Sequence, residues 1–384
     1  MAARLEGSNG EQDARKVVAV ASDSPLSQAE SKLFSSGESW WLKWKTAHGL
    51  AAQKAWKTYE VRNVPAADGN YIHTHCYIPT TATADLPLVC LHGFGSGSGV
   101  FYSALPPLCE EWLGPVFAID APGCGLSSRP PWRKGATCPL DQAEMFFIDS
   151  FEIWRQALGL ERFCLLGHSL GAMLAVAYTE RFPEVVHRLI LLSPAGVPRK
   201  PENDRDRFAK LSFRYRLFIT ILMTLWKRGW SPFTAIRWGP GKRYMRSYVR
   251  RRFRSGSWKD GEALFQYYYH NICHSNLSWG GHAHSMLMLP GAYGRSPLCD
   301  RVPLLPRTCT VSFIYGTTDW MNHEHAEAIQ RASKPSSAPR VEVARVAGTG
   351  HHVPVDNPLG FVEALLASGR LEEGCSFDGR IFGE

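Results

Sequence analysis

The chain has 384 residues, 45% of them hydrophobic, and a formal net charge of +8. This is enough apolar sequence for one sizeable globular domain with an inserted cap. Its ten cysteines form no C-x-x-C pair, which argues against a zinc site and a disulfide framework and favours a reducing, cytoplasmic compartment.

The start of the chain contains two segments of different composition. Residues 1–35 are rich in Ala, Ser, Gly, Asp and Glu and lack the apolar core of a signal peptide, so we expect this segment to be disordered. Residues 40–56 begin with Trp-Trp-Leu-Lys-Trp-Lys. Aromatic and basic side chains together fit a membrane interface, so we expect this stretch to face a membrane. A first helix packed in the core is an equally good alternative.

Two short apolar runs follow, at residues 86–91 and 115–119, and each predicts a buried strand. The first ends in His-Gly and a loop rich in Gly and Ser, and the second leads into Asp-Ala-Pro-Gly-Cys-Gly-Leu-Ser at 120–127. Fixed backbone N–H groups in such a loop can stabilise the negative oxygen that forms when an ester is attacked. We assign one of these donors to Phe94. A plain Gly-rich turn is the alternative.

The most informative motif is Gly-His-Ser-Leu-Gly at 167–171. It lies between a strand predicted at 162–166 and a helix that starts with residues 172–178. A serine on a tight strand-to-helix turn is a nucleophile elbow, and the glycines are needed because a Cβ there would collide with the neighbouring strand or helix. The motif predicts Ser169 as the nucleophile and the backbone N–H of Leu170 as the second oxyanion donor. A chance match in a Gly-rich turn is the alternative.

The alternation of strands and helices stops between residues 196 and 290, after a strand predicted at 188–193. We expect a helical cap there. Eighteen Lys/Arg against three Asp/Glu lie between Arg199 and Lys259, interleaved with aromatic residues. Such a surface suits anionic lipid headgroups, at about 1 kcal/mol per basic residue near a membrane, or the phosphate of lysophosphatidic acid. The alternatives are a solvated basic face and nucleic acid, but no nucleic-acid motif is present, so no nucleic-acid partner is expected.

Residues 217–226 within this region are strongly apolar. A helix that spans a bilayer needs about 20 such residues. We therefore expect a cap helix that lines an acyl channel or dips into lipid, in a protein that is peripheral on membranes or lipid droplets and has no transmembrane helix.

Two late motifs supply an acid and a base. A strand predicted at 311–315 runs into Gly and then Asp319, and His351 follows a Gly near the end of the chain. The order Ser, Asp, His separates α/β-hydrolases from other serine hydrolases. We predict His351 as the general base and Asp319 as the acid that orients it. Asp300 and Asp149 are weaker alternatives for the acid, and His352 is the fallback base. A helix N-cap is the structural alternative for Asp319.

Together these motifs resemble the α/β-hydrolase superfamily, which implies a mostly parallel central sheet with flanking helices and an inserted helical cap. The expected core is 36–195 and 291–384, and the expected cap is 196–290. From about Trp40 to the C-terminus the chain resembles the subfamily of α/β-hydrolase-domain proteins four and five. The points of likeness are the Trp-rich stretch, the oxyanion segment, the elbow and Gly-His-His-Val-x-x-Asp-x-Pro at 350–358.

This resemblance implies a role in glycerolipid and phospholipid turnover. The family includes lysophospholipases, N-acyl-phospholipid lipases and lysophosphatidic acid acyltransferases, which make phosphatidic acid with acyl-CoA as co-substrate. One animal branch carries Asn at the nucleophile position and acts as a lipase co-activator. Because Ser169 is present, the chain looks more like the plant or algal members, and a regulator with little activity is the second reading. A small-ester or peptide hydrolase is the third.

The family's acyltransferase motif, H-x-x-x-x-D, maps onto His351 and Asp356. Its histidine is the predicted triad base, and Asp356 also fits an N-cap for the apolar helix that follows. The motif is therefore compatible with acyl transfer without showing it. We expect no metal and no cofactor beyond acyl-CoA as a co-substrate, and the sequence leaves protein partners unknown.

Overall fold

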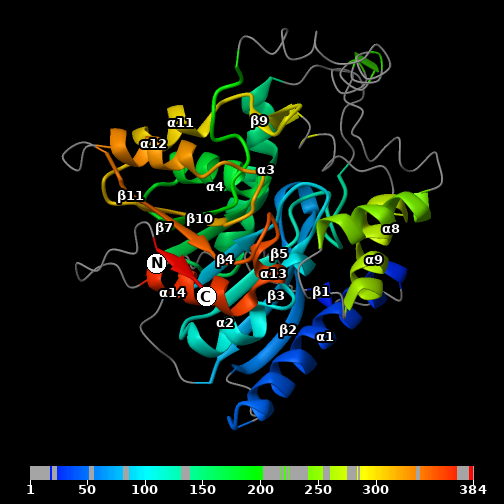
Figure 1. Ribbon diagram of the computed structural model, residues 1–384. Coiled ribbons are helices and arrows are strands. Elements are labelled where there is room, and N and C mark those ends of the chain that lie inside the picture. The colour runs from blue at the N-terminus through cyan, green and yellow to red at the C-terminus, as the bar shows by residue number, and fades with distance from the viewer. Residues whose placement is uncertain are drawn as a thin grey trace, which may run out of the picture.

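A single mixed sheet of ten strands organises the molecule (Figure 1). The computed structural model describes residues 18–19, 24–51, 56–80, 86–130, 139–201, 217, 220–221, 224, 241–253, 260–274, 283, 286–333, 338–369 and 380–383. The strand order is β1-β2-β3-β5-β4-β6-β7-β10-β11-β12. The pairs from β1 to β5 are antiparallel, and every pair from β5 to β12 is parallel. The predicted mostly parallel central sheet is thus confirmed.

The strands of this sheet are between two and ten residues long. They are β1 (Val18–Ala19), β2 (Trp56–Pro65), β3 (Tyr71–Pro79), β4 (Leu88–Leu91), β5 (Val116–Ile119), β6 (Phe163–His168), β7 (Val186–Leu192), β10 (Thr310–Gly316), β11 (Arg340–Val346) and β12 (Ile381–Phe382). A separate hairpin pairs β8 (Met288–Leu289) with β9 (Tyr293–Gly294). All five predicted strands are present, with boundaries within two residues of those expected.

Helices cover both faces of the sheet. They are α1 (Pro25–Ala47), α2 (Leu105–Glu111), α3 (Leu140–Ala157), α4 (Leu170–Arg181), α8 (Gly241–Arg252), α9 (Gly261–Tyr269), α11 (Leu298–Arg301), α12 (Glu324–Ala332), α13 (Val353–Asp356) and α14 (Pro358–Gly369). Figure 1 shows α3, α4, α11 and α12 on one side of the sheet and α1, α2 and α14 on the other.

The sheet separates two hydrophobic cores because successive side chains of a strand point to opposite faces. In β4, Val89 and Leu91 belong to the core under α3 and α4, whereas Leu88 and Cys90 belong to the core under α1, α2 and α14. All four side chains are almost fully buried. A strand that is apolar on both faces is typical of a parallel sheet covered by helices on each side, and it explains the uninterrupted apolar runs in the sequence.

Helix α1 corrects the predicted boundary of the N-terminal segment. Residues 1–35 were expected to be disordered, but residues 18–19 form β1 and residues 25–35 form the first turns of α1. The helix begins at Pro25 behind the N-cap Ser24, whose side chain accepts a hydrogen bond from the backbone N–H of Ser27. Its residues Leu26, Ala29, Leu33 and Phe34 recur at helical spacing and are buried. Residues 1–17 and 20–23 of the predicted segment lie outside the described residues.

The predicted membrane-facing stretch, 40–56, begins within α1 and ends at Trp56 in β2. Trp41 is buried, and its indole Nε1 donates to Glu110 Oε2 at 2.6 Å. The buried ammonium group of Lys45 pairs with the same carboxylate. For these two residues the predicted membrane-facing role is wrong, and the alternative of a helix packed in the core is correct. The reason is that both polar groups bind the Glu110 carboxylate on α2. Trp40 and Trp44 are half-buried.

The predicted cap, 196–290, is described in part. Helices α8 and α9 belong to it, whereas residues 202–216 and 225–240 lie outside the described residues. Within the apolar segment 217–226 the described residues are helical, and Leu217 and Ile221 are each half exposed. Among the helices that the structure describes, none is both long and apolar enough to cross a bilayer.

The close approach of α1 to the loop after β4 predicts a destabilising Gly37→Ala substitution. A Cβ on Gly37 would collide with the backbone carbonyl of Tyr102. An unhindered Gly→Ala change inside a helix stabilises a protein by roughly 0.5–1 kcal/mol, whereas overpacking costs roughly 1–3 kcal/mol. We therefore expect Gly37→Ala to lower the free energy of unfolding, measured by urea denaturation. Ser35→Ala, on the exposed face of the same helix, is the control and should change it by less than about 0.5 kcal/mol. Stabilisation by Gly37→Ala would contradict this packing.

Candidate active site

The turn between β6 and α4 holds Ser169 in an unusual backbone conformation. Its φ is 55° and its ψ is −116°, a region that a non-glycine residue occupies only when its surroundings enforce it. A Cβ on Gly167 would clash with the backbone of Gly171, and a Cβ on Gly171 would lie 2.5 Å from the carbonyl oxygen of His92. Both glycines are therefore required by close packing, as the motif predicted.

The structure brings Ser169, His351 and Asp319 together from three parts of the chain. His351 lies in the loop after β11, and its Nε2 is 3.0 Å from Ser169 Oγ. Its Nδ1 is 3.2 Å from Oδ1 of Asp319, which follows β10. With the proton on Nδ1, the ring donates to the carboxylate and accepts from the serine hydroxyl. This is the arrangement that a serine nucleophile, a base and an orienting acid require.

The electrostatics of the acid are set by two opposing effects. Burial on its own would raise the pKa of Asp319, but the hydrogen bond and the charge of His351 outweigh it and hold the pKa below its usual value. The Oδ1 atom of Asp319 also accepts a hydrogen bond of 3.0 Å from the backbone N–H of Met321. Asp319 is therefore ionised near neutral pH and can stabilise a positive charge on the imidazole.

The alternative acids and the fallback base lie elsewhere. Asp300 is paired with Arg199, with Oδ1 2.7 Å from the guanidinium, and Asp149 is exposed on α3. The ring of His352 is buried 4.6 Å from that of Phe253. Burial and the neighbouring histidines lower the pKa of His352, so this side chain packs as a neutral group.

The two residues predicted as oxyanion donors flank Ser169. Leu170 is the first residue of α4, where backbone N–H groups have no partner within the helix. Phe94 follows Gly93, which lies so close to the nucleophile that a Cβ on it would be 2.8 Å from Ser169 Cβ. The loop that carries Phe94 is fixed by His92, which donates from Nδ1 to the Gly93 carbonyl at 2.8 Å and accepts at Nε2 from Ala121 N–H at 2.9 Å.

Two positioning residues hold the loop of His351, and sequence reasoning missed both roles. Nε2 of His168 donates to the carbonyl oxygen of His351 at 2.9 Å. Oδ2 of Asp356 accepts from the backbone N–H of Gly350 at 2.9 Å. His168 stands inside the elbow motif, so its place was visible in the sequence, but its contact joins residues 183 positions apart.

The predicted N-cap role of Asp356 is wrong. Asp356 is the last residue of α13, and Asn357 precedes α14. Oδ1 of Asn357 accepts from the Gly360 N–H at 2.9 Å, which is the N-cap bond. The cap moves by one residue because the carboxylate of Asp356 is engaged by the loop before His351.

The site is linked to the basic helix α8 of the cap. The ring of Trp320, which is 53% exposed, lies 5.4 Å from the ring of His351. The guanidinium of Arg252, the last residue of α8, lies 5.6 Å from the centre of the Trp320 ring, within cation–π distance. The Trp320 side chain therefore lies between the positively charged end of α8 and the imidazole of His351.

The neutral state of His168 predicts an acid-sensitive fold. Burial and the adjacent His351 lower the pKa of His168 from 6.5 to about 3. The unfolded chain takes up this proton below about pH 6.5 and the folded protein only near pH 3, so stability falls as the pH decreases through that window. The greatest slope from this one group is about 1.4 kcal/mol per pH unit.

We expect urea denaturation between pH 7.5 and pH 5 to show a shallower loss of stability for His168→Gln, which keeps a donor for the His351 carbonyl, than for the wild type. Substitution of the exposed His48 by Gln is the control. Equal slopes in all three proteins would contradict the lowered pKa of His168.

Comparisons with known proteins agree with this architecture. A family model described as alpha/beta hydrolase fold matches residues 87–358. The chain is also similar to the carboxylesterase CesB (YbfK) of Bacillus subtilis, with a TM-score of 0.56 over 89% of this chain and 96% of that one. At 17% sequence identity this likeness shows the fold alone.

Several relatives are more similar in sequence. A probable 1-acylglycerol-3-phosphate O-acyltransferase of Oryza sativa subsp. japonica is 36% identical over 75% of this chain and 70% of its own length. The human 1-acylglycerol-3-phosphate O-acyltransferase ABHD5 is 31% identical over 79% of this chain and 83% of its own length. The human (lyso)-N-acylphosphatidylethanolamine lipase is 29% identical over 71% and 75%. The resemblance predicted from the sequence is thereby confirmed, and the chain belongs to the α/β-hydrolase fold family.

Proposed function

We propose that this protein is a serine-dependent acyl-ester enzyme that acts on glycerophospholipids or lysophospholipids. The observation that carries the proposal is the hydrogen-bonded series from Ser169 Oγ through His351 to Asp319, at 3.0 and 3.2 Å. A neutral serine is a weak nucleophile and needs an adjacent base of this kind. The names of its relatives, which include lipid acyltransferases and a lipase, support a lipid as the substrate.

The proposed reaction begins with attack of Ser169 Oγ on an ester or thioester carbonyl carbon. His351 Nε2 takes the hydroxyl proton, and Asp319 stabilises the resulting imidazolium. The backbone N–H groups of Phe94 and Leu170 bind the negative oxygen of the tetrahedral intermediate. The intermediate then expels the leaving group, which receives the proton from His351, and the acyl group stays on Ser169.

A second nucleophile then releases the acyl group from Ser169. Water gives a free fatty acid, and the hydroxyl of a bound lysophosphatidic acid gives phosphatidic acid. The same base and oxyanion donors serve both outcomes, with acyl-CoA as the co-substrate for transfer. Asp356 acts as a positioning residue in this scheme, because its carboxylate holds the Gly350 N–H next to the base.

The basic face of α8 supports an anionic lipid surface. Arg243, Arg246 and Arg250 line an open groove of about 600 Å³ together with Phe265 of α9. Arg246 lies 4.5 Å over the Phe265 ring. Cationic and aromatic groups together suit the headgroup region of a membrane. Half-exposed Leu217 and Ile221 add apolar contact in the same cap. We propose that the protein is cytoplasmic and peripheral on membranes or lipid droplets.

The choice between hydrolysis and transfer is testable by product analysis. Wild type and Ser169→Ala are each given labelled acyl-CoA with lysophosphatidic acid, and separately labelled phospholipid, in vesicles of phosphatidylcholine with or without phosphatidylserine. Labelled phosphatidic acid from the wild type alone, measured by mass spectrometry, identifies an acyltransferase. Free fatty acid alone identifies a lipase. A wild type with no activity above the Ser169→Ala background would overturn the enzymatic proposal in favour of a lipid-bound regulator.

The orienting role of Asp319 predicts a large loss of activity when its carboxylate is replaced by an amide. Asp319→Asn is expected to lower kcat by about 10⁴-fold, because the amide stabilises the wrong imidazole tautomer and cannot balance the imidazolium charge. Asp300→Asn is the matched control, since Asp300 pairs with Arg199 on the surface, and should leave kcat unchanged. Comparable activities for Asp319→Asn and the wild type would contradict the assigned acid.

A further inference from the structure

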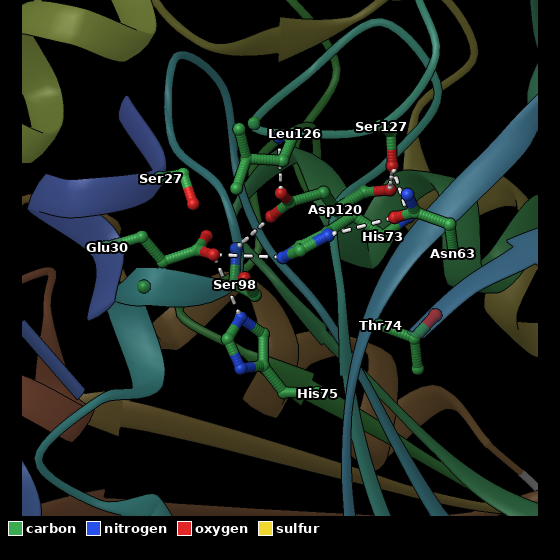
Figure 2. Close-up of polar contacts among 12 residues, drawn as sticks. Ser27, Glu30, Asn63, His73, Thr74, His75, Ser98, Asp120, Leu126 and Ser127 are labelled. Carbon is green, nitrogen blue, oxygen red and sulfur yellow. Dashed lines mark hydrogen bonds and ion pairs between the residues drawn. The ribbon is translucent and has the colours of Figure 1, made fainter. Parts of the chain in front are cut away.

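Three ionisable side chains meet under α1, outside the candidate active site. Glu30 comes from α1, and His73 and His75 come from β3, where alternate residues share a face. Glu30 Oε2 lies 2.9 Å from His73 Nε2 and 3.4 Å from His75 Nε2. Figure 2 shows both imidazole rings directed at the one carboxylate. All three residues are at least 95% buried.

The outer nitrogen of each ring has its own partner. His73 Nδ1 is 3.2 Å from Asn63 Oδ1, and His75 Nδ1 is 2.9 Å from the hydroxyl oxygen of Tyr59. An amide oxygen only accepts, so His73 carries its proton on Nδ1. The tyrosine hydroxyl can accept from His75 in the same way. With this tautomer in both rings, both Nε2 atoms present lone pairs to the carboxylate, an arrangement that needs a positive charge between them.

Two atoms of this cluster have no hydrogen-bond partner among the described residues. These atoms are Glu30 Oε1 and His75 Nε2. A proton on His73 would make an ion pair with Glu30 but would leave both of these atoms buried and unpaired, which is unfavourable. A metal ion would use the lone pair of His75 and either oxygen of Glu30 as well as His73.

We propose that Glu30, His73 and His75 form a zinc site that joins α1 to β3. Two imidazole nitrogens and one carboxylate are a ligand set typical of Zn²⁺, with a fourth position left for a water molecule. The three ligand atoms lie within 4.8 Å of one another. Bonds of about 2.0–2.1 Å in a tetrahedral site place ligand atoms roughly 3.4 Å apart. Glu30 Oε2 lies 2.9 Å from one Nε2 atom and 3.4 Å from the other, close to this separation. Asn63 and Tyr59 would orient the rings, as outer-shell partners of zinc-bound histidines do.

The local charge also favours a divalent cation. A second buried carboxylate, Asp120, lies near the cluster in Figure 2, with hydrogen bonds from the backbone N–H groups of Ser98 at 2.6 Å and Leu126 at 2.7 Å. With both histidines neutral, these two carboxylates are a double negative charge in a buried region, which a Zn²⁺ ion would balance. Such an ion would join α1 to β3, and α1 also packs against α9 of the cap.

The expectation that the chain has no metal site rested on the spacing of its cysteines. The local signal of this cluster is His-x-His in a strand, which places two imidazoles on one face. Its third member, Glu30, lies 43 residues before His73, in a segment expected to be disordered. The sequence alone therefore did not connect the carboxylate with the histidines.

The first test is the metal content of the tag-free, full-length protein. Inductively coupled plasma mass spectrometry after extensive dialysis should find about one zinc per chain in the wild type. Glu30→Gln and His75→Gln should reduce it at least tenfold, and the control His48→Gln, an exposed histidine at the end of α1, should retain it. Equal zinc content in all four proteins would show an adventitious ion only and overturn the proposal.

The second test uses the wild type and so does not depend on the folding of the variants. Treatment with a strong chelator should lower Tm by roughly 5 °C, and added Zn²⁺, but not Mg²⁺, should restore it. Glu30→Gln should show neither change. A wild type that holds no zinc and whose Tm is insensitive to chelator and Zn²⁺ would establish a buried ion pair instead. Neither test relies on enzymatic activity, so the outcome is independent of the proposed function.

Discussion

The left-handed backbone at Ser169 is the constraint on which the rest of the candidate site depends. A residue with a side chain adopts a φ of 55° only when its neighbours leave no alternative. Here β6 continues the sheet up to His168, and α4 begins at the next residue after the serine, so the chain must reverse within one position. The glycines at 167 and 171 let the strand, the helix and the loop after β4 approach one another at backbone distance.

The base reaches this serine through long-range contacts. The loop of His351 is held by His168 from the strand that carries the nucleophile and by Asp356 from the short helix that follows. His168 must stay neutral to fill this place, since the imidazole of His351 becomes positively charged in the proposed reaction. Burial keeps His168 neutral by lowering its pKa. The same buried histidine therefore positions the loop of His351 and makes the fold sensitive to acid.

The basic helix of the cap lies beside the site. Helix α8 presents Arg243, Arg246 and Arg250 along its groove, and its last residue, Arg252, contacts Trp320 beside the base. The N-terminal helix contributes differently from the expectation, because Trp41 and Lys45 bind Glu110 of α2 and anchor α1 to the core. In the proposed function, the cap rather than these two residues of α1 supplies the lipid surface.

Local sequence determined the strands, the elbow and the order of serine, acid and base. Each of these features depends on a short local signal in the sequence. The signals are an apolar run buried on both faces, a glycine required by a turn, and a polar residue directly after a strand. The family resemblance rests on the same segments. The sequence could not decide between Asp319 and its alternatives by physics alone, nor find the N-cap at Asn357 or the helix at residues 25–35.

Only the tertiary structure decided which distant polar groups share a buried space. Glu30 meets His73 and His75, Trp41 meets Glu110, and His168 meets the carbonyl of His351 across large separations in the chain. Such contacts cannot be recognised from the hydrophobic periodicity of the sequence. A single polar residue in a helix or strand gives the same pattern whether it faces solvent or a buried partner. The cost of burying it unpaired selects the partner, and that selection exists only once the chain is folded.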